Sequence, residues 1–376
     1  MFVFHVALPS STTLPVDRIL LFAETEAVTT SVLKEYYVTQ LLAEDTVLAR
    51  LAAEGVTPGD SLKRFVLSDL EELLHALQGI TLLDNYRPSV SRSLRFAAYQ
   101  ASLEAIVAAK DASAMLKAMI SHFRTFGFGA TAKYVAFRWQ NGLVGIEDPD
   151  PVTLSQLYCL DRQKEILTEN TEAFLSGHPA NNVLLYGNSG CGKSSMVKAL
   201  LNTYHEQGLR LVQMNKEDLA ELPLLLDTLK AQTFRYLVFM DDLSFEGNDD
   251  RYKALKTILE GGLACQPSNV LFYATSNRFH LVSETWEERR GEDIHVKDTQ
   301  NEKLSLSERF GIRISFLAPA QNDYLRMIEG ILADHGIAFT QALRTEALQW
   351  AVLYNGRSGR TATQFAKSII AREAKA

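Results

Sequence analysis

One stretch, NNVLLYGNSGCGKSSMVKAL at residues 181–200, restricts the possible folds more than any other part of the chain. Its apolar residues 183–186 are typical of a short buried strand. Gly187, Gly192, Lys193 and Ser194 then fit the pattern G-x-x-x-x-G-K-[ST]. Glycines let a backbone curl around an anion, and the apolar spacing that follows predicts a helix whose N-terminus faces that anion. The stretch therefore predicts a strand, a phosphate-binding loop and a helix in succession.

The parts of this loop have predicted roles in binding ATP and Mg²⁺. The Lys193 ammonium would reach the β- and γ-phosphates, and the Ser194 hydroxyl would hold Mg²⁺. Backbone N–H groups of the loop would surround the phosphates. The residues predicted to bind nucleotide here are Gly187, Asn188, Ser189, Gly190, Cys191, Gly192, Lys193, Ser194 and Ser195. The alternative is a tight strand–helix turn that carries a lysine by chance.

The composition favours a globular protein with several cores. Of its 376 residues, 47% are apolar and 22% are charged, which suits two or three domains. A net charge of −7 gives no overall attraction to nucleic acid or to an anionic membrane. The cysteines Cys159, Cys191 and Cys265 have no zinc or disulfide spacing, which fits a reducing cytoplasm.

No segment of the sequence predicts membrane insertion. No uninterrupted apolar run is long enough to span a bilayer. The first residues, MFVFHVALPSS, lack a basic start, so we interpret them as a strand or buried segment rather than a signal peptide.

The residue patterns divide the chain into three predicted domains. Residues 1–150 are mainly helical, residues 151–318 alternate strands with helices, and residues 319–376 are helical again. Near the end of the first, residues 134–139 alternate like a strand, and residues 141–151 are typical of a turn and linker.

The middle domain is predicted to be a parallel α/β sheet, because its strands alternate with helices. The pattern predicts a helix from an N-cap at Asp161 to Gly177, and a later helix interrupted by Pro223. The strands expected in addition to residues 183–186 are residues 209–214, 236–242, 269–277 and 312–319.

Two acidic residues end the third predicted strand. Such acids would lie at the carboxyl edge of the sheet, where α/β proteins bind ligands. Asp241 would hold Mg²⁺ together with Ser194, and Asp242 would orient or deprotonate a water. The alternative is that both acids merely begin a loop. At the end of the fourth strand, Asn277, or next to it Thr275, would lie beside the γ-phosphate, unless that asparagine only makes a turn.

Arginines could supply positive charge to the γ-phosphate. Arg309 precedes the fifth strand and could reach the nucleotide of a neighbouring subunit, or else form a weak surface ion pair. Arg357 and Arg360 lie at a helix start in the tail, and one of them could fold back over the nucleotide. The alternative there is a solvated helix end, although a cation near a helix N-terminus is unfavourable.

Together these residues resemble an AAA+ ATPase. GNSGCGKS is similar to Walker A, YLVFMDD to Walker B, ATSN to sensor 1, SERFG to the arginine-finger box and GRSGR to sensor 2. More narrowly, residues from about 151 to the C-terminus resemble the bacterial ATP-binding family known as domain of unknown function 815.

The resemblance implies a five-stranded αβα core, a small helical lid and ATP·Mg²⁺ between them, often in a ring of subunits. It also implies that backbone near residues 158–160 contacts adenine. Two departures stand out. AAA+ proteins usually end Walker B with Asp-Glu, whereas this chain has Asp241-Asp242, so hydrolysis would be slow unless Glu246 substitutes. Cys191 within the phosphate loop is either redox-sensitive or a neutral filler thiol, and we favour the latter.

The sequence thus predicts an ATPase in which the helical N-terminal domain binds a protein client. The first hypothesis is ATP-driven remodelling of a protein or a protein–nucleic-acid complex by a homo-oligomer. The second is a slow, nucleotide-dependent binding switch or scaffold, favoured by the Asp-Asp pair and by the lack of an obvious substrate-threading loop. Phe245 is the nearest aromatic for such a loop, and a core position suits it better. A helper acting on DNA is less favoured, since no basic, aromatic-interleaved patch is present.

Overall fold

The computed structural model describes most of the chain: residues 4, 14–26, 28, 31–78, 80, 83, 86, 97–230, 232–245, 251–259, 266–278, 281, 306–354 and 356–374. Two compact units are present. The first comprises Met1–Phe137, Leu143–Glu147 and Thr228–Phe234, and the second comprises Arg138–Gly142, Asp148–Asp227 and Arg235–Ala376. The domain boundaries at residues 150 and 318 stay a prediction.

The first unit is mainly helical. Its longest helix, α4, buries Val66, Leu70 and Leu73 along one face, as the spacing of its leucines requires. Helix α6 ends where Gly127 adopts a positive φ of 71°, a conformation that favours glycine. The described helices of this unit are α1 (Val16–Glu26), α2 (Val32–Ala43), α3 (Val47–Ala53), α4 (Asp60–Gln78), α5 (Ala97–Val107), α6 (Ala112–Phe126) and α7 (Ala130–Lys133).

Part of the predicted linker after this unit is a strand. Strand β1 (Ala136–Trp139) is followed by β2 (Leu143–Ile146), so the prediction of turn and linker over residues 141–151 is wrong for its middle part. Asn141, with φ 51°, and the following glycine turn the chain back at this point. Gly145 within β2 lies against the ring of Tyr134, where a Cβ would not fit. The glycines that suggested a loop thus serve a turn and a close packing contact.

The second unit contains the predicted parallel sheet. Strands β3 (Val183–Gly187), β4 (Leu209–Gln213), β5 (Arg235–Met240), β6 (Val270–Ser276) and β7 (Ile312–Phe316) are parallel, in the order β4-β5-β6-β3-β7. With β1 and β2 the sheet has seven strands, in the order β2-β1-β4-β5-β6-β3-β7. Every residue of β6 is buried, as expected of a central strand covered on both faces.

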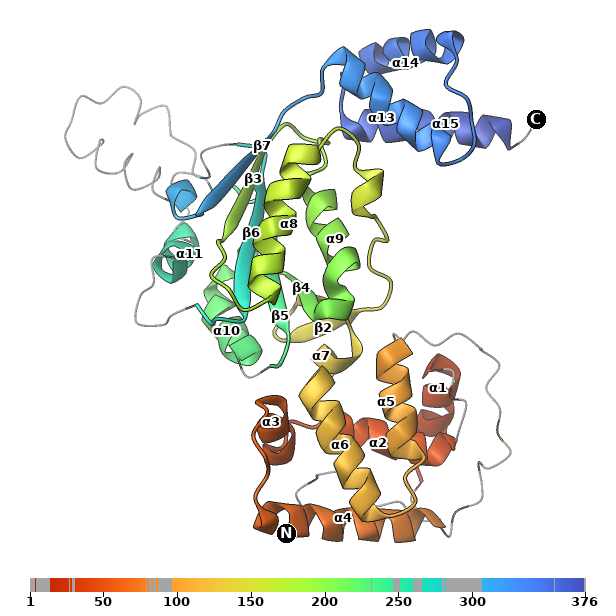
Figure 1. The fold of residues 1–376 in the computed structure, drawn as a ribbon, viewed down its shortest axis with the longest axis vertical. Helices are drawn as coiled ribbons and strands as arrows, with labels where there is room; N and C mark the ends of the chain where they lie inside the picture. Colours follow the sequence, from red (N-terminus) through yellow and green to blue (C-terminus); the bar gives the residue numbers. More distant parts are fainter. Residues whose placement is uncertain are drawn as a thin grey trace, which may run out of the picture. The chain divides into compact units, whose positions relative to one another are not determined.

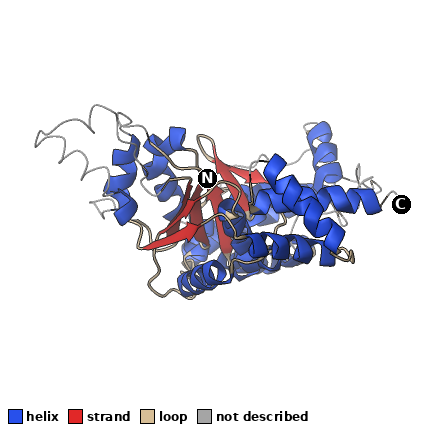
Figure 2. Ribbon diagram, turned by 90° about the horizontal axis from the view of Figure 1, so that it is seen from above, coloured by secondary structure: helices blue, strands red, loops and turns tan. Residues whose placement is uncertain are grey.

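Helices cover both faces of this sheet (Figures 1 and 2). Helices α8 and α9 lie on one face, and α10 and α11 lie on the other (Figure 1). Their bounds are α8 (Asp161–Leu175), α9 (Lys193–Tyr204), α10 (Leu222–Lys230) and α11 (Arg251–Leu259), and short 3-10 helices span Leu154–Gln156, His205–Gln207 and Lys216–Glu221. The arrangement is the αβα core that the sequence predicts.

Two helix boundaries differ from the predictions. Asp161 is the first residue of α8 and Leu160 is its N-cap, without a side-chain capping bond. Pro223 does not interrupt a helix but is the second residue of α10, where the missing N–H of proline removes no helical hydrogen bond.

The tail forms a small helical lid within the second unit. Helices α13 (Gln321–Ala333), α14 (Gln341–Leu353) and α15 (Gly359–Glu373) pack together. Tyr324, Ile328, Phe365 and Ile369 lie in their common core, each at most 1% exposed. Ser358 caps α15, since its hydroxyl accepts a hydrogen bond from the N–H of Thr361. Within the described residues, no helix has the length and apolar character to cross a membrane.

Some predicted features lie outside the described residues. These are Glu246, Cys265 and the N-terminal segment apart from Phe4, which is buried.

Candidate nucleotide site

The phosphate-loop motif forms a compact turn between β3 and α9. Gly187, Gly190 and Gly192 have positive φ angles of 129°, 75° and 95°. A Cβ on Gly187 would collide with the backbone of Phe316 in β7, and the N–H of Asn188 donates to the Phe316 carbonyl at 2.9 Å. Glycine is therefore required here both for backbone conformation and for close packing against the neighbouring strand.

Lys193 is held inside this loop. Its ammonium donates to the carbonyls of Gly187 and Asn188, both at 2.8 Å, and to the Asn277 side-chain oxygen at 3.0 Å. The residue is only 7% exposed, and burial lowers the pKa of the Lys193 ammonium. An anionic ligand would relieve this desolvation, because an opposite charge favours the protonated amine.

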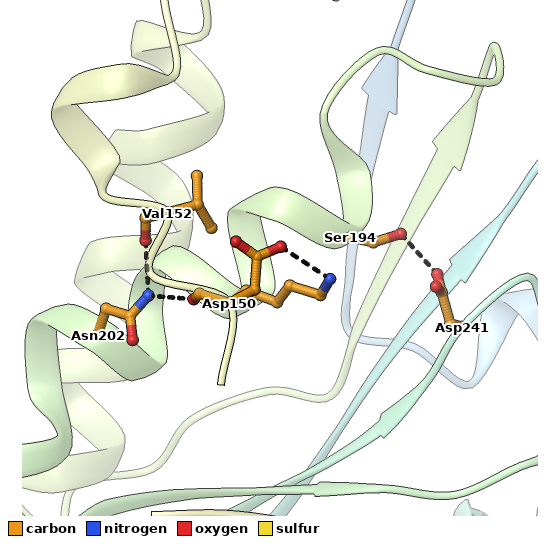
Figure 3. Close-up of polar contacts among 6 residues, drawn as sticks. Asp150, Val152, Ser194, Asn202 and Asp241 are labelled. Carbon is orange, nitrogen blue, oxygen red and sulfur yellow. Dashed lines mark hydrogen bonds and ion pairs between the residues drawn. The ribbon is translucent and has the colours of Figure 1, made fainter. Parts of the chain in front are cut away.

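The two residues predicted to hold Mg²⁺, Ser194 and Asp241, are hydrogen-bonded to each other. The Ser194 hydroxyl, at the start of α9, donates to Oδ1 of Asp241 at the end of β5, at a distance of 2.6 Å (Figure 3). Thr275 of β6 donates to the same oxygen, also at 2.6 Å. The start of α9 and the carboxyl end of β6, the strand next to β5, thus bring to Asp241 residues that are 47 and 34 positions away in sequence.

Asp242 and Asn277 meet beside Lys193. The Asn277 side-chain amide donates to Oδ1 of Asp242 at 2.7 Å while its oxygen accepts from Lys193. Asn277 therefore bridges the loop lysine and the second acid. Asp242 has φ 52°, a left-handed conformation that is uncommon for a residue other than glycine.

These groups line a cavity of about 670 Å³ in the second unit. The core contributes Ser189–Ser195 of the loop, the two acids, Thr275 and Asn277. The lid contributes Met327 and Ile331 from α13, and Arg360, Gln364 and Lys367 from α15. The backbone N–H of Arg360 also donates to the Gly190 carbonyl at 2.9 Å, so the start of α15 contacts the phosphate loop directly.

The segment predicted to contact adenine lines the same cavity. Tyr158 and Leu160 are part of its wall. The Tyr158 ring lies against Gly330 of α13, where a Cβ would not fit, and its hydroxyl donates to Asp334 at 2.6 Å. Burial and this bond raise the pKa of Tyr158 to about 12. Apolar walls and a tyrosine near the lid fit a planar base at this end of the cavity.

Of the remaining predicted residues, the cysteine and the phenylalanine are buried, and the arginines are exposed. Cys191 is buried, and desolvation raises the pKa of its thiol, which agrees with a neutral filler rather than a reactive thiolate. Phe245 is 1% exposed, so the core position expected for it is correct. Arg357 and Arg309 are exposed and do not line the cavity, whereas Arg360 does.

Sequence reasoning missed several residues of the cavity wall. Lys198, Gln364 and Lys367 belong to it, as does Gln156. Lys198 lies one helical turn beyond Ser194, so helical periodicity from the loop could have identified it. Gln364 and Lys367 lie four and seven residues beyond Arg360, so the same periodicity could have identified them from the prediction that Arg360 folds back over the nucleotide.

The segment leading into this unit is fixed to α9 (Figure 3). Asn202 donates through its amide to the carbonyls of Asp150 and Val152, each at 2.7 Å. Lys198, which also lines the cavity, pairs with the Asp150 carboxylate at 3.1 Å. The helix that starts at the phosphate loop therefore holds residues 150–152 on its outer side.

The residues present fit ATP with Mg²⁺. The loop glycines take positive φ angles that let the backbone curl around an anion, and Ser194 and Asp241 supply the hydroxyl and carboxylate oxygens that Mg²⁺ accepts. Within the described part of the chain, no group of three or more His, Cys, Asp or Glu side chains forms a metal cluster. One carboxylate and one hydroxyl suffice when phosphates and waters complete an octahedral shell.

Comparison with known proteins identifies the family. The model described as protein of unknown function (DUF815) matches residues 132–373. This chain belongs to the DUF815 family. The resemblance to this family inferred from the motifs is thereby confirmed, and the strand order β4-β5-β6-β3-β7 agrees with the predicted αβα core.

More distant similarities connect this DUF815 protein with replication factor C and RuvB proteins. It is 38% identical over 69 residues to the replication factor C large subunit of Staphylothermus marinus, covering 18% of this chain and 16% of that protein. It is 31% identical over 111 residues to the corresponding subunit of Methanococcus vannielii, covering 28% and 23%. The matches thus span less than a quarter of either relative.

Solved structures of Thermotoga maritima RuvB are also similar. One mutant form of RuvB aligns with a TM-score of 0.41 and 17% identity, over 60% of this chain and 68% of that one. The structure described as the RuvB Holliday junction branch migration motor aligns with a TM-score of 0.34 and 14% identity, over 58% and 72%.

Proposed function

We propose that this protein binds ATP·Mg²⁺ in the cavity between the sheet and the lid and hydrolyses it to engage or remodel a client. The client would be a protein or a protein–nucleic-acid complex, bound through the helical first unit. The cavity's convergence of Lys193, Ser194, Asp241, Asp242 and Asn277 carries this proposal. In order, they would supply a cation for the phosphates, two ligands for the metal ion, an acid that orients the water, and an amide that links this acid to the lysine.

Each residue has a task in this scheme. Lys193 binds the β- and γ-phosphates, exchanging its carbonyl partners for phosphate oxygens. Ser194 and Asp241 would hold the Mg²⁺, which would supply positive charge beside the phosphates. Asp242 orients the attacking water, and Asn277 restrains that carboxylate. Arg360 approaches the phosphates from the lid, so lid position and nucleotide state are coupled.

A second function, a slow nucleotide-dependent switch, is favoured by the state of Asp242. Its side chain is one methylene shorter than the glutamate usual in AAA+ proteins, and one of its oxygens already accepts a bond from Asn277. A shorter carboxylate has less reach toward a water, and the bond from Asn277 occupies one of its two oxygens. In that case ATP would set the conformation, and hydrolysis would only reset it.

Nucleotide binding and phosphate release test the proposal. We expect a fluorescent ATP analogue to bind the full chain in a Mg²⁺-dependent manner, and Lys193→Ala to weaken it by about a hundredfold, since a charged partner of phosphate is lost. Asp242→Asn should retain binding and lose at least about tenfold in turnover. Exposed Lys230→Ala, on α10, is the matched control and should behave as wild type.

The outcomes separate the alternatives. Absence of nucleotide binding by the wild type would overturn both functions. If the wild type binds nucleotide but hydrolyses ATP no faster than Asp242→Asn does, the remodelling ATPase is excluded and the switch remains.

A further inference from the structure

Thr275 is a buried residue that contacts both acidic residues of the candidate site. It lies at the carboxyl end of the central strand β6 and is 1% exposed. Its hydroxyl donates to Oδ1 of Asp241 at 2.6 Å and accepts from the backbone N–H of Asp242 at 2.8 Å. A threonine hydroxyl has a single proton to donate, and here that proton is directed to Asp241.

The backbone of Thr275 adds a third bond to the same segment. Its carbonyl accepts from the N–H of Leu243 at 2.7 Å. Thr275 thus contacts Asp241, Asp242 and Leu243 in succession. The φ angle of Asp242, 52°, is unfavourable for an aspartate and persists only where the surrounding structure enforces it. Thr275 therefore holds the chain after β5 in the turn that directs both carboxylates into the cavity.

Two hydroxyls share one oxygen of Asp241. Ser194 and Thr275 both donate to Oδ1. A serine hydroxyl could hold a metal ion through an oxygen lone pair, whereas the buried Thr275 hydroxyl has its proton on Asp241 and is placed to orient that carboxylate. Hydrogen bonds to a ligating carboxylate fix its orientation and commonly change metal affinity by about 10- to 100-fold.

We propose that Thr275 is a positioning residue that orients Asp241 for Mg²⁺ and fixes the backbone of Asp242. The inference rests on the proposed function and assigns to Thr275 a role other than contact with the γ-phosphate. Its only proton is committed to Asp241, so the phosphate contact falls to Asn277 and Lys193.

The test measures how Mg²⁺ changes nucleotide affinity, independently of turnover. A fluorescent ATP analogue is titrated into the full chain at a series of Mg²⁺ concentrations and with EDTA. Thr275→Val has nearly the same shape without the hydroxyl, and Thr275→Ser retains the hydroxyl. Buried Ser276→Ala is the matched control, because the Ser276 hydroxyl accepts from the N–H of Arg278 and contacts neither acid in the described structure.

We expect Thr275→Val to raise the Mg²⁺ concentration at half-effect by about tenfold while affinity in EDTA is unchanged. For Thr275→Ser, the Mg²⁺ concentration at half-effect should stay within about threefold of the wild-type value. For Ser276→Ala it should equal the wild-type value. Thr275→Val with wild-type Mg²⁺ dependence, or with an equal loss of affinity in EDTA, would overturn the positioning role. Absence of Mg²⁺-dependent binding by the wild type would instead overturn the proposed function itself.

Discussion

His122 shows how one buried side chain in the first unit can make stability depend on pH. It is fully buried on α6, where the rings of Tyr99 and Phe126 pack around it. Its Nδ1 lies 3.0 Å from the Ser102 hydroxyl, and its Nε2 has no hydrogen-bond partner in the described structure. Burial without a compensating charge lowers the pKa of His122 to about 4.

The first unit should therefore lose stability as the pH falls from about 6.5 toward about 4. In that interval the unfolded chain binds a proton that the folded chain does not, so protonation favours unfolding. The loss at full titration is about 3 kcal/mol, from about 1.36 kcal/mol per pKa unit. Denaturant unfolding at about pH 8 and pH 5 measures this loss of unfolding free energy, and hydrogen exchange of the α5 and α6 amides at the same two pH values locates it in the first unit.

Substitutions separate this effect from general acid destabilisation. His122→Gln should reduce the stability difference between the two pH values, whereas exposed His75→Gln should leave it unchanged. If wild type and His122→Gln show the same difference in stability between the two pH values, His122 is not the source of that difference.

At the level of elements, α15 and the phosphate loop meet backbone to backbone. The N–H of Arg360 donates to the Gly190 carbonyl, and a Cβ on Gly359 would lie 3.2 Å from that oxygen. Contacts at this distance force a shift of a few tenths of an ångström. Since α15 contributes Arg360, Gln364 and Lys367 to the cavity, the position of the helix sets the width of the nucleotide site.

Gly359→Ala should consequently weaken nucleotide binding by about threefold to tenfold, because overpacking at this contact costs about 1 kcal/mol. Gly359 lies in the first turn of a helix and its backbone is not left-handed, so the effect would come from the added methyl group. Equilibrium titration with a fluorescent ATP analogue measures it. Gly59→Ala is the control, since nothing lies within 4 Å of its added Cβ. Unchanged affinity in Gly359→Ala would show that this contact does not govern the site.

The sequence allowed prediction of those elements whose signals are local. Strand β3, the loop glycines and α9 follow from one short stretch, and the acids at the end of β5 follow from the apolar run before them. Strand β2 was missed because Gly145 and the acidic residues that follow it are typical of loops. Its neighbour in the sheet is β1, the strand just before it, so the turn at Asn141-Gly142 between two apolar runs was a local signal that the sequence did contain.

Contacts between distant elements were beyond prediction. The two hydrogen bonds of Thr275 to Asp241 and Asp242, and the bond from Arg360 to Gly190, depend on strand order and on lid packing. A sequence pattern identified the participants Arg360 and Asp241 without indicating which atoms meet. Hydrogen-bond partners of this kind come from register and tertiary packing rather than from residue type.

At the scale of the whole molecule, Arg309 remains outside the cavity of its own chain. It follows the short helical turn at residues 306–308, is exposed, and does not line the nucleotide site. Hydrolysis of the γ-phosphate gains from an arginine near the transferred group, and that residue can come from another subunit. An exposed arginine beside β7 is suited to such a role if copies of the chain assemble.

We therefore expect specific ATPase activity to rise steeply with protein concentration, and Arg309→Ala to lower turnover by about a hundredfold or more while nucleotide affinity stays within about threefold.

Mixing two variants tests directly whether Arg309 acts on the nucleotide of a neighbouring subunit. Asp242→Asn lacks the acid but keeps Arg309, and Arg309→Ala keeps the acid. A mixture of the two inactive variants forms some sites with both groups, so activity should return to a measurable fraction of wild type. Exposed Arg313→Ala, on the adjoining strand β7, is the matched control and should retain activity. If the mixture stays as inactive as its components while wild-type activity is independent of concentration, catalysis is confined to one subunit and Arg309 is not shared.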